Sequence, residues 1–345
     1  MDPLTQGVLG AALPQSTWAK WSSHRKYQVA IAGFLGMLGG MAADLDVLIS
    51  SSTDPLLFLT FHRQFTHSLI FIPLGGLTLA LLVQWVLGRV LGHRWQLRFW
   101  QTALLCSLGY ATHALLDTAT SYGTMLFWPF VETRYSWSVV SIVDPLFSVP
   151  LALSVVMATL RNDPRLARVG LVWALVYLAA GWWQHQGARD IAADLAASRG
   201  HAPLRFEIKP SFGNILVWKS VYETEDKFFI DAMRVGIAPQ VYEGTSVSKL
   251  KVGQAFPWLG PDSQQARDVT RFIKFSDGFT ALDPANPERI VDVRYSFVPN
   301  EVSALFSIEL APDAGPRDHV RYQTHREQAR EQFGRLWRLL VESRP

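Results

Sequence analysis

Hydrophobic residues are concentrated in the first 190 positions of the chain, where they form runs long enough to cross a lipid bilayer. The clearest run is SLIFIPLGGLTLALLVQWVLG, residues 68–88, which carries no charge over 21 residues. About 20 helical residues, at 1.5 Å each, cross the roughly 30 Å hydrocarbon core. More polar candidate spans lie at 28–49, 99–120, 139–160 and 169–187. The pattern predicts a helical integral membrane domain of about five spans within residues 1–190.

The pattern changes after residue 190. Two segments, LRFEIKPSFGNILVWKSVYETEDKFFIDAMRVG and ERIVDVRYSFVPNEVSALFSIEL, alternate apolar with polar residues and are broken by Pro, Gly and Asn, which is typical of antiparallel strands. A helix is expected at 263–274, and the segment 319–343 spaces Phe333, Leu336, Trp337, Leu340 and Val341 as one apolar helix face. Residues 191–345 are therefore predicted to form a soluble α+β domain that has an antiparallel sheet and ends in an amphipathic helix.

The first residues, MDPLTQGVLGAALPQS, have no basic segment ahead of their short apolar stretch, so they are expected to form a short helix on or partly in the bilayer rather than a secretory signal. The only cysteine, Cys106, lies within a predicted span, which excludes an intrachain disulfide. The formal net charge of +3 and pI near 9.0 come from basic residues scattered over loops and the last helix. No nucleic-acid partner is expected.

The basic residues predict the orientation of the chain in the membrane. The short loops that would face the cytoplasm hold nine of them: Lys20, Arg25, Lys26, Arg89, Arg94, Arg98, Arg161, Arg165 and Arg168. The alternate loops, 50–67 and 121–138, hold only Arg63 and Arg134. Cytoplasmic loops carry the excess of Lys and Arg. The C-terminal domain is therefore expected outside the cytoplasm.

Seven acidic and histidine side chains interrupt the apolar segments, and this topology places all of them toward the non-cytoplasmic side. They are Asp44 and Asp46 near the end of the first span, His62 and His67 before the second, His113 and Asp117 in the third, and Asp144 early in the fourth. An ionised aspartate at the centre of a spanning helix costs roughly 2.5–3.5 kcal/mol on insertion scales. The insertion cost of several such groups must be offset by favourable interactions among them or with a bound ion.

A divalent metal ion would supply this compensation, because mixed imidazole and carboxylate ligands suit zinc, with manganese and iron as alternatives. Each residue taken alone also has an ordinary structural explanation. A histidine can hydrogen-bond between helices, Asp44 can cap a turn, and Asp144 before Pro145 can begin a helix. The gathering of so many such groups on one side favours the metal site.

Four motifs carry a resemblance to a known family: GMLGGMAADLDVL, HRQFTHS, GYATHALLDTATSYGTMLFWP and SIVDPLF. In this order they resemble the motifs of the YdjM family of inner-membrane-associated metal-dependent hydrolases, over roughly residues 1–155. The resemblance implies a metal-dependent hydrolase whose site residues are Asp44, Asp46, His62, His67, His113 and Asp117. Many relatives look like Thr-His where this chain has Thr5-Gln6, and PDxD where Ala43 precedes Asp44. Gln6 could offer an amide oxygen in place of the histidine.

The resulting hypothesis is a membrane-bound metal-dependent hydrolase. His67, His113 and Asp117 are expected to bind the metal, while His62 and Asp46 complete a second metal site or act on the attacking water. Arg63 is expected to hold a phosphate or carboxylate of the substrate. The position near the outer face of the inner membrane, among membrane lipids, favours a small phosphoester or a lipid-linked substrate.

Two other functions remain open. An ion-coupled transporter also places acidic and histidine residues within spans, although a complete pathway would show polar groups at both depths of the membrane. An envelope scaffold could use the same ligands for a structural metal. The oligomeric state does not follow from the sequence.

Overall fold

The computed structural model describes residues 1–18, 27–92, 97–236, 238–325 and 329–341. These residues form two compact units. The helical unit comprises Met1–Leu48 and Phe61–Trp182, and the sheet unit comprises Ile49–Thr60 and Trp183–Pro345. This division differs from the expected boundary at residue 190 in two ways: it falls near Trp182, inside a helix, and it assigns a loop from the first half of the chain to the sheet unit.

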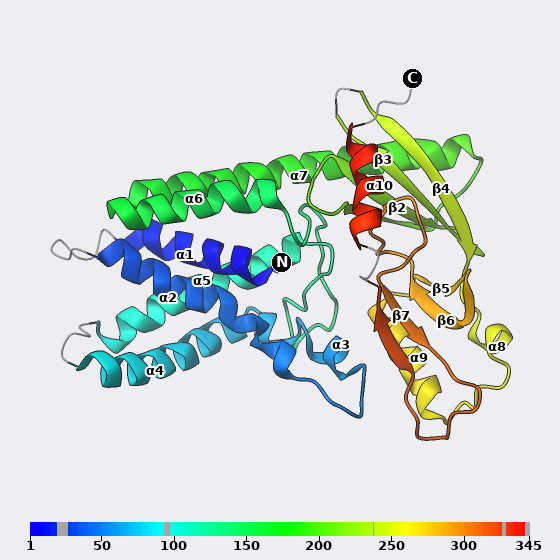
Figure 1. Ribbon diagram of the computed structural model, residues 1–345, viewed down its shortest axis with the longest axis horizontal. Helices are drawn as coiled ribbons and strands as arrows, with labels where there is room; N and C mark the ends of the chain where they lie inside the picture. The colour runs from blue at the N-terminus through cyan, green and yellow to red at the C-terminus, as the bar shows by residue number, and fades with distance from the viewer. Residues whose placement is uncertain (19–26, 93–96, 237, 326–328, 342–345) are drawn as a thin grey trace. The chain divides into compact units, whose positions relative to one another are not determined.

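The helical unit is built from helices that run side by side in Figure 1. In chain order they are α1 (Pro3–Trp18), α2 (Gln28–Ala42), the 3-10 helix η1 (Ala43–Leu48), the 3-10 helix η2 (Phe65–His67), α4 (Phe71–Leu91), α5 (Phe99–Ala119), α6 (Pro145–Arg161) and α7 (Pro164–Ser198). Helix α1 packs against α2, α5 and α6, with Ala11 and Ala12 buried. It is therefore part of the bundle rather than an isolated surface helix.

Three helical segments among the described residues are long and apolar enough to cross a membrane: Gln28–Leu48, Phe71–Leu91 and Pro164–Ser198. The expected count of five spans is not confirmed. Helix α5 is 21 residues long but carries the polar residues of the predicted site. Helix α6 has only 17 residues because it begins at Pro145, where Asp144 caps it, and not at residue 139. Of the basic residues that predict the orientation, Lys20, Arg25, Lys26 and Arg94 lie outside the described part of the chain.

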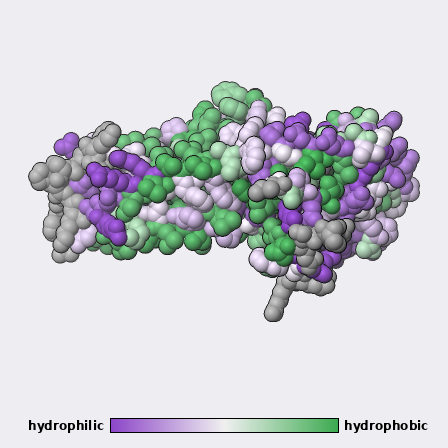
Figure 2. Space-filling model, turned by 90° about the horizontal axis from the view of Figure 1, so that it is seen from above, coloured by the Kyte–Doolittle hydropathy of each residue, from purple (hydrophilic) through white to green (hydrophobic). Residues whose placement is uncertain are grey.

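The outer surface of the helical unit is apolar. Leu81 on α4, Leu153 on α6 and Leu175 on α7 are each at least 60% exposed. Figure 2 shows green, hydrophobic residues covering much of the helices on one face of the molecule. Soluble proteins rarely expose contiguous apolar patches of this kind, whereas lipid-facing helices require them.

Helices α2 and α5 approach each other closely because glycines face each other between them. A Cβ added to Gly109 of α5 would lie 2.0 Å from the carbonyl oxygen of Gly36 on α2. Four residues further along both helices, His113 Nδ1 lies 2.6 Å from the carbonyl oxygen of Gly40. The two helices are therefore parallel, and small residues allow their backbones to meet. This packing brings the C-terminal ends of α2 and α5 together.

The sheet unit contains two antiparallel four-stranded sheets. The first has the order β1-β2-β3-β4 and the second β5-β6-β7-β8. Their strands are β1 (Arg205–Pro210), β2 (Val217–Glu223), β3 (Lys227–Arg234), β4 (Gln240–Ser248), β5 (Thr280–Asp283), β6 (Asn286–Asp292), β7 (Phe306–Glu309) and β8 (Arg321–Thr324). Apolar side chains from both sheets, including Val221, Phe228, Phe279 and Val291, share one core. The unit also contains the helices α3 (Leu57–Phe61, whose last residue belongs to the helical unit), α8 (Val252–Ala255), α9 (Gln264–Phe275) and α10 (Ala329–Val341).

Two sequence expectations for this unit need correction. The segment 319–343 is not one helix, because Arg321–Thr324 pairs with β7 as an edge strand and only Ala329–Val341 is helical. The loop 50–67 is not a simple connection between spans, because Leu56 and Leu59 lie in the core of the sheet unit with Phe272 and Ile308. The segment Ile49–Thr60, which ends two residues before His62, thus belongs to the sheet unit.

Candidate metal centre

The structure brings together seven of the residues singled out from the sequence. Asp44 and Asp46 come from η1 at the end of α2, His62 and Arg63 follow α3, His67 ends η2, and His113 and Asp117 lie one turn apart on α5. Asp144 is not part of this group. It caps α6 through the N–H of Phe147 and accepts hydrogen bonds from the Tyr177 hydroxyl, so its ordinary structural explanation holds.

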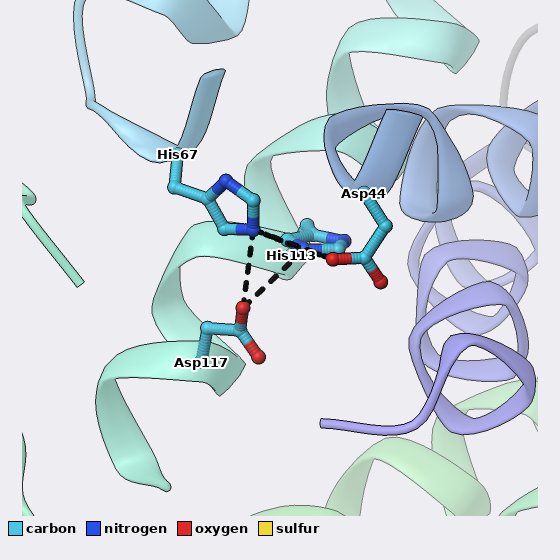
Figure 3. A group of neighbouring side chains, drawn as sticks. All are labelled: Asp44, His67, His113 and Asp117. Atoms are coloured by element: carbon cyan, nitrogen blue, oxygen red, sulfur yellow. Dashed lines mark hydrogen bonds and ion pairs between the residues drawn. The ribbon is translucent and has the colours of Figure 1, made fainter. Parts of the chain in front are cut away.

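Four side chains point their donor atoms at one another, namely Asp44, His67, His113 and Asp117 (Figure 3). The Nε2 atom of His67 lies 2.9 Å from Nε2 of His113, 3.5 Å from Asp44 Oδ1 and 3.2 Å from Asp117 Oδ2. The Nε2 atom of His113 lies 3.4 Å from each of the same two carboxylate oxygens.

These separations fit a metal site. In a tetrahedral zinc site with bonds of about 2.0–2.1 Å, neighbouring ligand atoms lie roughly 3.3–3.4 Å apart. The separations found here run from 2.9 to 3.5 Å. A set of two imidazoles and two carboxylates also suits zinc, manganese or iron.

Hydrogen bonds at the Nδ1 atoms fix the orientation of the two imidazole rings. His113 Nδ1 donates to the carbonyl oxygen of Gly40. His67 Nδ1 lies 2.9 Å from Thr66 Oγ1 and 3.3 Å from Asp46 Oδ2, and the Thr66 hydroxyl itself donates to Asp46. These partners assign the proton to Nδ1, which leaves both Nε2 lone pairs directed at each other. Only a cation or a shared proton between the rings relieves that repulsion.

The carboxylate of Asp117 is oriented by contacts to its Oδ1, which leaves its Oδ2 facing the other side chains of the cluster. Its Oδ1 accepts a hydrogen bond of 2.7 Å from Gln6 Nε2 and also pairs with the amino group of Met1. Its fully buried Oδ2 lies 3.1 Å from Arg63 Nε, and the Nε2 atoms of His67 and His113 lie 3.2 and 3.4 Å from the same oxygen. The nearby guanidinium lowers the cost of burying this charge. Oδ2 therefore faces the two imidazoles, in a position from which it could bind a cation.

Asp46 orients residues of the site through hydrogen bonds to His62, Arg63 and Thr66. One carboxylate oxygen lies 2.8 Å from His62 Nδ1, and the other accepts hydrogen bonds from the backbone N–H of Arg63 and the hydroxyl of Thr66. Asp44, Asp46 and His62 form a second group whose donor atoms lie within 4.8 Å of one another. Asp44 belongs to both groups, which is the position of a carboxylate that could bridge two metal ions.

The charges around His67 are unbalanced. The three carboxylates of Asp44, Asp46 and Asp117 face the guanidinium of Arg63 and the amino group of Met1, both of which pair with Asp117. Burial opposes a charged imidazolium at His67, but hydrogen bonds and charge interactions with the three carboxylates outweigh it and raise the pKa of His67 to about 10. The site therefore favours one positive charge at this point, supplied by a proton or by a metal ion. Burial lowers the pKa of His62, against the opposing effect of Asp46.

Arg63 is more enclosed than the sequence indicates. It is only 4% exposed, its Nη1 donates to Thr120 Oγ1, and its guanidinium lies over the ring of Tyr122. Its backbone has a positive φ of 58°, which places it at a sharp turn between the two histidines of the motif.

One residue of the site did not stand out in the sequence, and another has a different role from the one expected. Thr66 is part of the HRQFTHS motif, yet a threonine before a histidine is not by itself a signal. Gln6 was expected to offer its amide oxygen as a ligand, but its Nε2 donates a hydrogen bond to Asp117 instead. Both residues act through hydrogen bonds between segments far apart in the chain.

A third group of possible ligands lies in the sheet unit, formed by Asp54, Asp268 and His319. Arg271 donates to both carboxylates, at 2.9 and 3.2 Å, and His319 Nδ1 lies 2.8 Å from Asp268. The guanidinium thus bonds to both carboxylates and occupies the space between them. This group is best explained as an ion-pair network that fixes the segment Ile49–Thr60.

Comparison with known proteins bears on the helical unit. A family model described as YdjM inner membrane protein matches residues 1–188. The chain belongs to this family. The match confirms the resemblance carried by the four motifs and identifies an inner membrane protein, and it includes every residue of the candidate metal centre. Neither the curated proteins nor the solved structures include a match to this chain.

Proposed function

We propose that this YdjM-family protein is a metal-dependent hydrolase with its site in the helical unit. The observation that supports this most strongly is the convergence of Asp44, His67, His113 and Asp117, whose ligand atoms lie close enough together to bind one ion. Of these side chains, Asp44 is 15% exposed and the other three are fully buried. Access for water and substrate is therefore expected at Asp44.

A bound divalent metal would lower the pKa of a water molecule toward neutrality and polarise the bond to be cleaved. His113 and His67 would bind it through Nε2, held in place by Gly40 and Asp46. His62 is the residue proposed to take the proton from the attacking water. Its Nδ1 bonds to Asp46, an arrangement that orients an imidazole for general-base catalysis.

Arg63 is proposed to balance the carboxylates and to orient Asp117, because its guanidinium is enclosed between Asp117 and Thr120. Any direct contact with an anionic group of the substrate would use the donors that these two residues do not occupy. A phosphoester or lipid-linked substrate at the outer face of the inner membrane is the proposed substrate class.

The test is metal analysis of the purified protein together with a panel of phosphoester and lipid-linked substrates. His67→Ala and Asp117→Asn should lose bound metal and hydrolytic activity while the protein stays in the membrane, because neither side chain lies in the apolar run 68–88. Asp144→Asn is the matched control, since this buried aspartate lies outside the cluster and should leave metal content unchanged.

Wild-type metal content in both His67→Ala and Asp117→Asn would rule out the proposed site. Metal that depends on these residues, without hydrolysis of any substrate, would instead favour the scaffold with a structural metal.

A further inference from the structure

Helix α10 has apolar side chains on two different faces. Leu336 is 1% exposed and packs into the sheet unit, whereas Phe333, Trp337 and Val341 are 47%, 54% and 54% exposed. The three exposed residues follow one another at intervals of four, so they form one line along the helix. Only part of the apolar face expected from the sequence is therefore used to close the sheet unit.

The orientation of α10 is fixed by its contacts with the first sheet. Tyr242 of β4 donates from its hydroxyl to the carbonyl oxygen of Leu339 at 2.8 Å, and Arg234 of β3 donates to that of Leu340 at 3.2 Å. Both bonds reach the last turn of the helix, where carbonyl groups have no partner within the helix. The line of Phe333, Trp337 and Val341 is thus held on the side of α10 that the sheet does not cover.

The strand end that holds α10 lies beside helix α7. Val235 follows Arg234, and a Cβ added to Gly187 of α7 would lie 2.9 Å from the side chain of Val235. Helix α7 has 35 residues, but only about 20 are needed to cross the hydrocarbon core. The span predicted from the sequence, residues 169–187, ends at Gly187.

Trp182 and Trp183 are 52% and 72% exposed, as expected for tryptophans at a membrane interface. Gly187 lies four residues beyond Trp183, a rise of only about 6 Å along a helix. The strand end that carries α10 is therefore close to the level at which α7 leaves the bilayer.

The side chains of α10 fit a lipid surface. Tryptophan and phenylalanine prefer the boundary between headgroups and acyl chains. Arg338, next to Trp337, is exposed and can pair with an anionic headgroup. Leu216, which is 44% exposed and accepts the backbone N–H of Val235, adds an apolar residue at the same strand end.

We propose that α10 lies on the membrane surface, with Phe333, Trp337 and Val341 inserted at the boundary between headgroups and acyl chains. The helix would then fix the sheet unit to the bilayer at a second point besides α7. This inference is independent of the proposed hydrolase activity, because none of its residues belongs to the metal centre.

Spin labelling of the full-length protein in nanodiscs of zwitterionic and anionic phospholipids tests the proposal. One label is placed at Trp337→Cys and a second, in a separate variant, at Phe333→Cys. The control label is placed at Thr270→Cys, an exposed position on α9. Cys106 is buried and is not expected to react.

Accessibility of each label to oxygen, which concentrates in lipid, is compared with accessibility to a water-soluble nickel complex. The oxygen-to-nickel ratio should be severalfold higher at positions 333 and 337 than at 270. A ratio at 333 and 337 equal to that at 270 would overturn the proposal. So would protection from both reagents, which indicates a protein partner, or spin–spin broadening, which indicates a second copy of the chain on this face.

Discussion

Replacing Gly109 by alanine should disrupt the proposed metal centre without changing any of its proposed ligands. Gly109 lies four residues before His113 on α5, and Gly36 lies four residues before Gly40 on α2. The added Cβ would lie 2.0 Å from the carbonyl oxygen of Gly36, and the other atoms within reach are also backbone. No side-chain rotation can relieve this contact, so the two helices must separate.

The size of the separation follows from the contact distance. Carbon–oxygen contacts are comfortable from about 3.3 Å, so α2 and α5 would have to part by roughly 1.3 Å near Gly109. The Nε2 of His113 on α5 and the Oδ1 of Asp44, just after α2, are now 3.4 Å apart. Metal–ligand distances tolerate only about 0.2 Å. We expect a loss of about 1–3 kcal/mol in the free energy of unfolding and at least tenfold weaker metal binding.

The assay is equilibrium dialysis of the purified protein against zinc, with thermal unfolding measured in parallel. Gly88→Ala on α4 is the control, because its added Cβ meets no atom within 4 Å. It should leave both metal affinity and stability close to wild type. Wild-type zinc affinity in a folded Gly109→Ala variant would refute the reasoning that the close approach of α2 and α5 sets the geometry of the site.

Two further predictions concern the helical unit. Gln6→Leu should weaken metal binding about tenfold or more, because Asp117 loses the hydrogen bond that orients its carboxylate. Gln15→Leu changes a buried glutamine of the same helix that donates to Thr159, and it should leave the metal affinity measured by dialysis unchanged. Equal losses of affinity in both variants would contradict the role assigned to Gln6. A reporter enzyme that folds only in the periplasm should be active when it is fused after Pro345, as the distribution of basic residues predicts. Activity of a reporter that works only in the cytoplasm, fused at the same position, would contradict the predicted orientation.

Much of the fold follows from local sequence pattern. An uncharged run such as 68–88 has few alternatives to a spanning helix, and alternation in the second half has few alternatives to strands, because both signals depend on neighbouring residues alone. Segment ends are less well determined. The helix expected at 139–160 begins only at Pro145, where the hydrogen bonds of Asp144 decide the start.

The candidate site was predictable as a set of residues but not as an arrangement. Asp44 and Asp46 are chemically equivalent in the sequence, yet they lie two positions apart on a 3-10 turn and so point in different directions. Asp44 faces His67 and His113, whereas Asp46 bonds to His62 and Thr66.

The sequence by itself determined the apolar helices, the strands and the family motifs, because each depends on residues close together in the chain. The tertiary structure alone decided which carboxylate meets the histidines, that Leu56 and Leu59 complete the core of the sheet unit, and that one line of α10 stays exposed. These outcomes depend on contacts between segments far apart in the chain. Local periodicity shows which residues share a face, but only packing selects the partner of that face.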